Sequence, residues 1–238
     1  YCRPFSSSST ATMPGTESSR EYLSQQIIDS CLAMNAHGIN QGSAGNISAR
    51  YRHGFLITPS GIAYDCLKPE HIVFVDLQGN CDDALNPSSE WRMHCDIYVN
   101  RAEAGAVLHA HPTFATALSC LRQDIPAFHY MVAVAGGNSI RCADYALFGT
   151  QALSDYMLEA LRERRACLLG THGMICFHDN LDKALWLGVE VETLAKQYWY
   201  ARQAGDPVIL SKAQMDEVQQ QFEGYGKQPT GDSENNEC

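Results

Sequence analysis

The stretch Ala106-Val107-Leu108-His109-Ala110-His111-Pro112 joins a short apolar run to two histidines and a proline. An apolar run that ends in such a breaker predicts a buried strand. Side chains at positions i and i+2 of a strand point to the same face, so both imidazoles can reach one metal ion. A pair of hydrogen-bonded histidines at a strand end is the alternative. The His-x-His spacing alone does not decide between the two.

Composition places the chain among folded globular proteins. Of its 238 residues, 45% are hydrophobic and 18% are charged, which is typical of one domain with a sizeable core. The formal net charge is −10 without a basic stripe, so no nucleic-acid partner is expected. No apolar run approaches the roughly 20 residues of a membrane-spanning helix, and no membrane partner is expected. A negatively charged substrate would have to be held by local amides and hydroxyls.

The ten cysteines predict a reducing compartment. No two of them have Cys-x-x-Cys spacing, and several lie inside apolar runs. Free thiols in such positions pack as small hydrophobic side chains. We therefore expect no disulfide framework and a cytoplasmic location.

Apolar periodicity and turn residues predict a mixed order of helices and strands. Helices are expected at 18–38, 88–101, 113–121, 151–164 and 181–203, with a last one from 211. Strands are expected from 46 and at 55–58, 72–75, 106–111, 127–134, 166–169 and 174–177, with a helical turn at 68–71. Because early hairpins replace strict βαβ alternation, we expect an α/β protein of the α+β type. Its single domain would have a mainly antiparallel central sheet flanked by helices.

The folded domain is expected to span residues 18–226. Ser18 and Glu21 have capping-box spacing, which favours a helix start at that point. The Ser/Thr-rich segment 1–17 lacks the apolar region of a secretory signal and predicts a disordered leader. The polar segment 227–238 predicts a disordered tail.

A catalytic zinc ion usually has three protein ligands, so the His-x-His pair needs a third. His172 is a candidate because it lies between Thr171 and Gly173 at the junction of two predicted strands. The remaining histidines are expected in loops, on a helix face or in a strand, and spacing alone leaves the choice open. Glu90 follows two serines at a predicted helix start, where it is either an acid/base group or an ordinary helix-terminal glutamate.

Three backbone segments could hold a phosphate group. Ser88 and Ser89 precede the first turn of a predicted helix, whose free amides bind anions. The glycine-rich loop 42–46 and the Ser60-Gly61 turn could supply further amides. The alternative is that the two serines only cap the helix.

Five motifs occur in order along the chain. They are Gly45-Asn46-Ile47-Ser48, Ile57-Thr58-Pro59-Ser60-Gly61, Ser88-Ser89-Glu90, His109-Ala110-His111-Pro112 and His172-Gly173. Together they resemble the class II aldolase/adducin family of zinc-dependent sugar-phosphate enzymes, over about Ser18 to Tyr225. The resemblance implies a nine-stranded, mainly antiparallel sheet with flanking helices. It also implies a homotetramer with active sites at subunit interfaces.

The resemblance implies a role for each matching residue. It makes His109, His111 and His172 the ligands of one Zn²⁺ per subunit, and Glu90 both a resting ligand and the catalytic acid/base. Tyr130, from a neighbouring subunit, and Tyr225, near the C-terminus, would be catalytic tyrosines that move a proton. The implied phosphate pocket consists of Asn46, Ser60, Gly61, Ser88 and Ser89.

The implied reaction is the reversible cleavage of a phosphorylated small sugar, a ketose 1-phosphate. L-fuculose 1-phosphate is the expected substrate, with dihydroxyacetone phosphate and L-lactaldehyde as products. One alternative is a related enzyme of the same family, either another phosphoketose aldolase or L-ribulose-5-phosphate 4-epimerase, which carries aspartate where this chain has Glu90. The other is a non-catalytic module like the adducin head, which the presence of three histidines and Glu90 disfavours.

Overall fold

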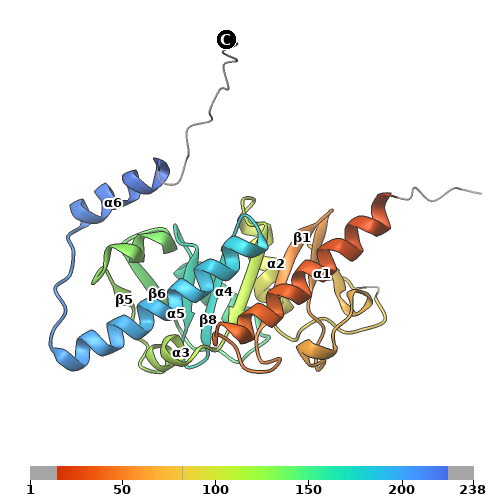
Figure 1. The fold of residues 1–238 in the computed structure, drawn as a ribbon, viewed down its shortest axis with the longest axis horizontal. Helices are drawn as coiled ribbons and strands as arrows, with labels where there is room; N and C mark the ends of the chain where they lie inside the picture. Colours follow the sequence, from red (N-terminus) through yellow and green to blue (C-terminus); the bar gives the residue numbers. More distant parts are fainter. Residues whose placement is uncertain (1–14, 82, 225–238) are drawn as a thin grey trace, which may run out of the picture.

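Eight strands form one sheet at the centre of the molecule (Figure 1). This computed structural model describes residues 15–81 and 83–224. Across the sheet the strands follow the order β3-β2-β1-β4-β8-β7-β6-β5, and neighbours are antiparallel except β6 and β7. The strands are β1 (Asn46–Tyr51), β2 (Gly54–Ile57), β3 (Val73–Asp76), β4 (Ala106–Ala110), β5 (Ile125–Pro126), β6 (Ser139–Ala143), β7 (Ala166–Leu169) and β8 (Gly173–His178). The expected fold class, an α/β protein with a mainly antiparallel sheet, is confirmed, with eight strands in the described part instead of nine.

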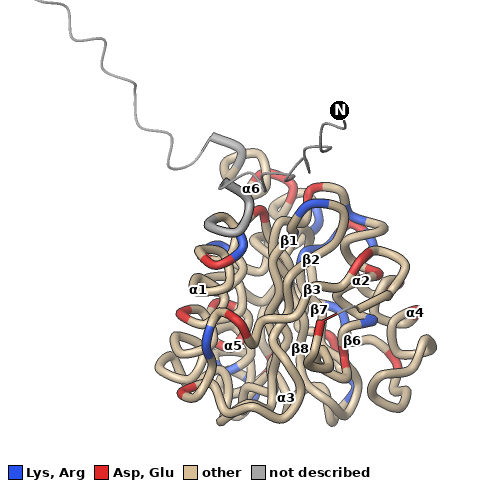
Figure 2. The backbone as a smooth tube through the Cα atoms, turned by 90° about the vertical axis from the view of Figure 1, so that its right-hand side faces the viewer, with Lys and Arg blue, Asp and Glu red and all other residues tan. Residues whose placement is uncertain are grey.

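Helices cover both faces of the sheet. They are α1 (Gly15–Ala36), α2 (Trp91–Asn100), α3 (Thr113–Cys120), α4 (Gln151–Ala160), α5 (Leu181–Ala204) and α6 (Lys212–Gly224), with short 3-10 helices η1 (Tyr64–Cys66), η2 (Pro69–His71) and η3 (Tyr130–Ala135). The edge-on view in Figure 2 shows α1 and α5 on one side of the strands and α2 and α4 on the other. Each side encloses its own buried apolar cluster. The result is a three-layer α/β/α arrangement.

β4 lies at the centre of the sheet and is buried over its whole length. It pairs with β1 on one side and with β8 on the other, so that Asn46 lies opposite His109 and His109 opposite Ile175. The strand is apolar on both faces because helices cover both, as the run at 106–110 predicts. Its carboxyl end therefore brings His109 to the middle of the molecule.

Side-chain acceptors satisfy the first free amides of α5 and α3, whereas α1 begins at Gly15, before the start at Ser18 that the capping-box spacing favoured. Asn180 precedes α5 and its side chain accepts a hydrogen bond from the amide of Lys183 at 2.9 Å. The carboxylate of Glu192 on α5 accepts hydrogen bonds from the first amides of α3, at 2.9 Å from Phe114 and 2.8 Å from Ala115. A carboxylate at a helix N-terminus satisfies free amides and interacts favourably with the helix dipole. This contact fixes α3 directly after His111.

Two expectations about secondary structure were wrong. The apolar segment 127–134 does not form a strand, because most of it turns into η3, where His129 accepts a hydrogen bond from the amide of Met131. Short apolar runs do not distinguish a strand from a buried helical turn. The strand β6 was not expected, since only Ile140 and Ala143 in it are buried.

The expected chain ends fall largely outside the described residues. Residues 1–14 of the leader and the tail 227–238 are not described, but α1 begins at Gly15, so that 15–17 belong to a helix and not to a leader. The eight cysteines in the described ranges are free thiols, as expected. Among those same residues no helix has the length and apolar character needed to cross a membrane.

Gly105, at the turn into β4, is predicted to be indispensable for stability. A Cβ atom at this position would overlap the carbonyl oxygen of Asp179. The Gly105→Ala protein should therefore lose about 1–3 kcal/mol of unfolding free energy through overpacking, measured by urea denaturation. Gly205→Ala is the matched control, because its Cβ would enter open space. Equal stability of the two variants would contradict this reading of the turn.

Candidate metal centre

Three histidines converge at the carboxyl end of β4. His109 is in β4, His111 follows it directly, and His172 lies in the turn between β7 and β8. The ring centroids of the three pairs are 4.8 to 4.9 Å apart. The Nε2 atoms of His109 and His111 are 2.9 Å apart. The structure therefore brings together the two histidines of the strand and the third from a distant turn.

The carboxylate of Glu90 completes the cluster. Glu90 ends the turn before α2, where its Oε2 lies 3.0 Å from Nε2 of His109 and its Oε1 lies 3.1 Å from Nε2 of His172. The four side chains place their ligand atoms within 4.8 Å of one another. Glu90 is only 6% exposed and His109 is fully buried. The site is thus held in the interior, with His111 and His172 toward its open side.

Local backbone features aim these side chains. Thr171, a non-glycine residue, has φ +56 directly before His172, which turns the chain sharply between β7 and β8. A Cβ at Gly173 would lie 2.6 Å from both the Ala110 carbonyl oxygen and the His111 ring. Glycine at this position lets β8 approach β4 closely enough for His111 and His172 to share one site.

The donor atoms fit a divalent cation. His109 Nδ1 lies 2.8 Å from the Met174 carbonyl oxygen, which can only accept, so Nδ1 carries the proton and the Nε2 lone pair faces the cluster. Glu90 Oε1 is buried and lies 3.1 Å from His172 Nε2, but no described residue donates a hydrogen bond to it. A bound cation would satisfy both this carboxylate oxygen and the His109 lone pair. Three imidazoles and one carboxylate are ligands that zinc accepts.

The protonation states agree with metal ligation. Burial alone would raise the pKa of Glu90, but His109 and His172 outweigh it and hold that pKa well below its usual range. Burial and the two neighbouring histidines lower the pKa of His111 to about 4. Glu90 is therefore an anion and His111 is neutral at pH 7, which are the forms that bind a metal ion.

A cavity of about 430 Å³ opens beside the cluster. Glu90, His111 and His172 line its inner end, and Tyr145, Ala146 and Phe148 line another part of its wall, together with Ala44, Ser89 and Thr171. The sequence did not single out Tyr145, Ala146 or Phe148. Their only signal was apolar character in a predicted loop before a helix, which does not indicate a binding wall.

The residues expected to hold phosphate lie in neighbouring segments. Pro59 and Pro87 form an isolated bridge, and the amide of Ser88 donates to the Thr58 carbonyl at 3.0 Å. The Ser60-Gly61 turn therefore lies beside Ser88 and Ser89, although Ser89 alone among these reaches the cavity wall. Asn46 is different, because it is buried and its amide nitrogen donates to Glu90 Oε2 at 2.9 Å.

The two expected catalytic tyrosines are not part of this cluster within one chain. Tyr130 lies in η3 with nearly half of its surface exposed, and its ring packs near Phe222 of α6. It does not line the cavity beside the histidines. Tyr225 lies outside the described residues.

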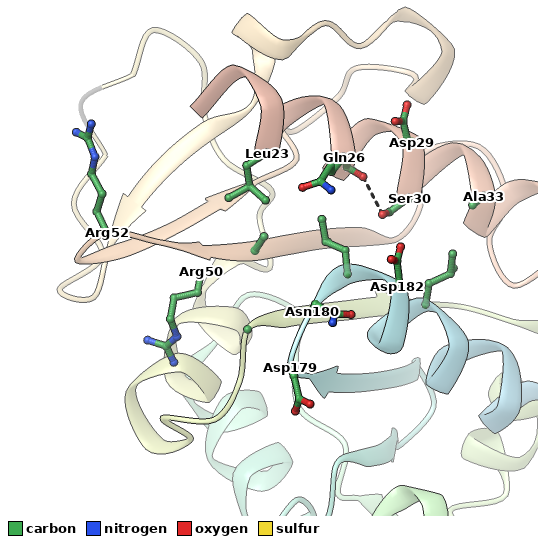
Figure 3. Close-up of a pocket in the computed structure, with 14 residues that line it drawn as sticks. Leu23, Gln26, Asp29, Ser30, Ala33, Arg50, Arg52, Asp179, Asn180 and Asp182 are labelled. Atoms are coloured by element: carbon green, nitrogen blue, oxygen red, sulfur yellow. Dashed lines mark hydrogen bonds between the residues drawn. The ribbon is translucent and has the colours of Figure 1, made fainter. Parts of the chain in front are cut away.

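A larger cavity of about 740 Å³ lies elsewhere, between α1, β1 and the start of α5 (Figure 3). Two of the charged side chains that line it, Asp179 and Arg50, already have partners. Asp179 pairs with Arg165 and Lys183, and Arg50 donates to backbone carbonyl groups. No residue of the histidine cluster lines it. The smaller cavity beside the histidines is therefore the candidate site.

Comparisons with known proteins identify the family. Residues 25–199 match the model of the Class II Aldolase and Adducin N-terminal domain. The chain belongs to the class II aldolase and adducin family. It is 50% identical to the L-fuculose phosphate aldolase of Escherichia coli (strain K12), over 87% of this chain and 97% of that protein. The predicted family and the predicted enzyme class, a class II aldolase, are confirmed.

Two further relatives show how far sequence similarity specifies the substrate of this class II aldolase. A protein of Rhodospirillum rubrum named 5-methylthioribulose-1-phosphate/5-deoxyribulose-1-phosphate aldolase is 49% identical over 90% of this chain and 96% of its own length. A solved structure of L-fuculose 1-phosphate aldolase matches with a TM-score of 0.82 and 38% identity, covering 85% of this chain and 96% of that one. Similar identity to aldolases of different names confirms the family but not one substrate.

The metal-free protein is predicted to lose stability in mild acid. Burial lowers the pKa of His94 to about 3 and that of His111 to about 4, from a usual 6.5. As the pH falls below about 6.5, the unfolded chain binds protons that the folded chain does not. The unfolding free energy should fall by up to about 1.4 kcal/mol per pH unit for each histidine. Urea denaturation from pH 7 to pH 4.5 measures this slope.

The slope has an internal control. His111→Asn removes the contribution of one histidine with a lowered pKa, so the stability of this variant should vary less steeply over the same pH range. A stability of the metal-free wild-type protein that does not change between pH 6.5 and pH 4.5 would contradict the prediction.

Proposed function

We propose that this class II aldolase binds one Zn²⁺ per subunit and cleaves a ketose 1-phosphate to dihydroxyacetone phosphate and an aldehyde. The observation that carries the proposal is the convergence of three imidazoles and the Glu90 carboxylate, whose Oε1 accepts no hydrogen bond from any described residue, beside a cavity. His109, His111, His172 and Glu90 would hold the ion. It would supply Lewis-acid stabilisation of the negative charge that develops on the substrate oxygens.

We propose that Glu90 transfers a proton during the reaction. Cleavage of the C3–C4 bond leaves a carbanion at the carbon that becomes C3 of dihydroxyacetone phosphate. In the direction of synthesis the Glu90 carboxylate removes a proton from this carbon. In cleavage Glu90 first takes up a proton from solvent and then delivers it to the same carbon. A tyrosine hydroxyl, from Tyr130 or Tyr225, exchanges the proton of the aldehyde oxygen. The aldehyde substituent would lie against the apolar wall that includes Tyr145 and Phe148.

The proposed phosphate pocket uses neutral groups. Ser60 and Gly61 lie beside Ser88 and Ser89, so hydroxyls and backbone amides from two segments can surround one phosphate. Such groups hold anions at helix N-termini without a basic side chain. We include Asn46 in this pocket as the family pattern implies, although its side chain contacts Glu90 in the structure.

We propose L-fuculose 1-phosphate as the substrate and L-lactaldehyde as the second product. Relatives named for 5-methylthioribulose 1-phosphate and 5-deoxyribulose 1-phosphate support a second candidate, cleavage of these pentulose phosphates by the same steps.

We further propose a cytoplasmic homotetramer with active sites at subunit interfaces. The position of Tyr130, half exposed and away from the cluster of its own chain, supports this arrangement.

The substrate proposal is tested with a panel of the three ketose 1-phosphates. Release of dihydroxyacetone phosphate is followed in a coupled assay with zinc-loaded protein, and kcat/KM is expected to be highest for L-fuculose 1-phosphate.

His109→Ala should lose both bound zinc and activity, because it removes a central ligand. His37→Ala, in an exposed loop, is the matched control. A His109→Ala protein that is metal-free and fully active would end the proposal.

The interface proposal predicts complementation between inactive variants. Tyr130→Phe should lower kcat by about 10²-fold or more, as removal of a general acid does, and His109→Ala should be inactive. Co-expressed hybrids of the two contain sites with His109 from one subunit and Tyr130 from another. These hybrids should regain activity, measured after purification through two different affinity tags. Hybrids as inactive as their parents would show that Tyr130 does not act across an interface.

A further inference from the structure

A row of hydrogen-bonded side chains leads from the metal centre into the interior. Asn46 Nδ2 donates to Glu90 Oε2 at 2.9 Å, and Asn46 Oδ1 lies 2.6 Å from His94 Nε2. On the other side of the His94 ring, Nδ1 lies 2.7 Å from Ser48 Oγ, which lies 2.9 Å from the Tyr98 hydroxyl. Two residues come from β1 and two from α2. The row therefore links the strand beside β4 with the helix that follows Glu90.

Every member of this row is buried. His94 and Ser48 are fully buried, and Tyr98, Asn46 and Glu90 are 2%, 3% and 6% exposed. Burial also lowers the pKa of His94 to about 3, so the ring is neutral and has one donor and one acceptor nitrogen. A polar atom that is buried without a hydrogen-bond partner costs free energy. The loss of one hydrogen bond in the row would therefore leave a neighbouring polar atom unpaired and weaken the others.

The direction of each hydrogen bond follows from the carboxylate end. Glu90 is an anion and can only accept, so Asn46 must present its amide nitrogen to it. The Asn46 carbonyl oxygen then faces His94 Nε2, which must carry the ring proton. His94 Nδ1 is left as an acceptor for the Ser48 hydroxyl, whose oxygen accepts in turn from Tyr98. Only one tautomer of His94 satisfies all of these contacts.

We propose that His94 is a positioning residue whose Nε2–H keeps the Asn46 amide nitrogen turned toward Glu90 and thereby fixes the Glu90 carboxylate in the histidine cluster. The proposal rests on the proposed zinc site. His94 contacts neither the cluster nor the cavity wall by any hydrogen bond, so it acts only through Asn46. Without it, the buried Asn46 carbonyl oxygen has no donor, and the side chain is no longer held in the rotamer that contacts the carboxylate.

Within residues 15–81 and 83–224, the polar contacts of the Glu90 side chain are those with Asn46, His109 and His172. Two of these contacts are to groups that a metal ion also binds. The Asn46 hydrogen bond is therefore the one that orients Glu90 independently of the ion. Outer partners of this kind change metal affinity or activity by about 10–100-fold.

The test compares three variants of the full-length protein. His94→Leu removes both hydrogen bonds of the ring, and His94→Gln offers a side-chain amide donor to Asn46 and a carbonyl acceptor to Ser48. Ser154→Ala is the matched control, since it removes another fully buried hydroxyl, one that donates to Asp96 of α2 at 2.6 Å. Zinc affinity is measured by competition with a chelator, and kcat and KM at saturating zinc.

The expected ranking of the variants by zinc affinity and kcat distinguishes a positioning role of His94 from a role in packing alone. His94→Leu should weaken zinc binding by about 10–100-fold and lower kcat more than it changes KM. His94→Gln should recover most of both losses, and Ser154→Ala should keep wild-type zinc affinity. Unchanged zinc affinity in His94→Leu would overturn the proposal, and so would an equal loss in Ser154→Ala. A wild-type protein that binds no zinc would instead refute the proposed function.

The tautomer provides a measurement on the wild-type protein, should His94→Leu not fold. Long-range ¹H–¹⁵N NMR distinguishes a proton on Nε2 from one on Nδ1, and the His94→Gln spectrum assigns the His94 signals by their absence. An Nε2–H tautomer in both metal-free and zinc-loaded protein is expected. An Nδ1–H tautomer would overturn the proposal whether or not zinc binds.

Discussion

The close approach of β1 and β8 to β4 is the constraint on which the metal centre depends. A Cβ at Gly45 would lie 2.5 Å from the His109 carbonyl oxygen, and one at Gly173 would lie 2.6 Å from that of Ala110. With glycine on both sides, the register places Asn46 opposite His109 and brings the Met174 carbonyl to the imidazole. The same backbone pairing that builds the sheet therefore also orients the ligands.

The centre combines polar groups with a buried position because those groups satisfy one another. Glu90 and the histidines offset the cost of burying charge, while Asn46 uses one end of its amide on the carboxylate and the other on His94. The pairing of α2 with β1 is thus partly polar, although apolar clusters cover both faces of the sheet. An interior that specifies hydrogen-bond directions allows fewer arrangements than an apolar one of equal volume.

Residue spacing predicted the central strand, the long helices and the mainly antiparallel sheet, since period and capping are local properties. It did not predict η3 or β6, where burial depends on distant contacts. His109 and His111 could be paired from sequence because they are two residues apart in one strand. Assigning His172 and Glu90 to the same site required the resemblance to a family. The fold brings positions 90, 109 and 172 together, and contacts between positions so far apart cannot be recognised from the local sequence. The contact of His94 with Asn46 could not be recognised from the sequence for the same reason.

The place of β4 in the chain has a consequence for folding kinetics. Its neighbours β1 and β8 begin about 60 residues before it and 67 residues after it, so the centre of the sheet forms only after two long loops have closed. Pairings of this range are slow because their loop-closure entropy is lost before contacts compensate it. The four candidate ligands come from β4 and the residue after it, from the turn between β7 and β8, and from the turn before α2. They meet only when β8 has paired with β4 and α2 has packed against the sheet. We therefore expect the candidate metal site to be complete only late in folding, after these distant segments have paired.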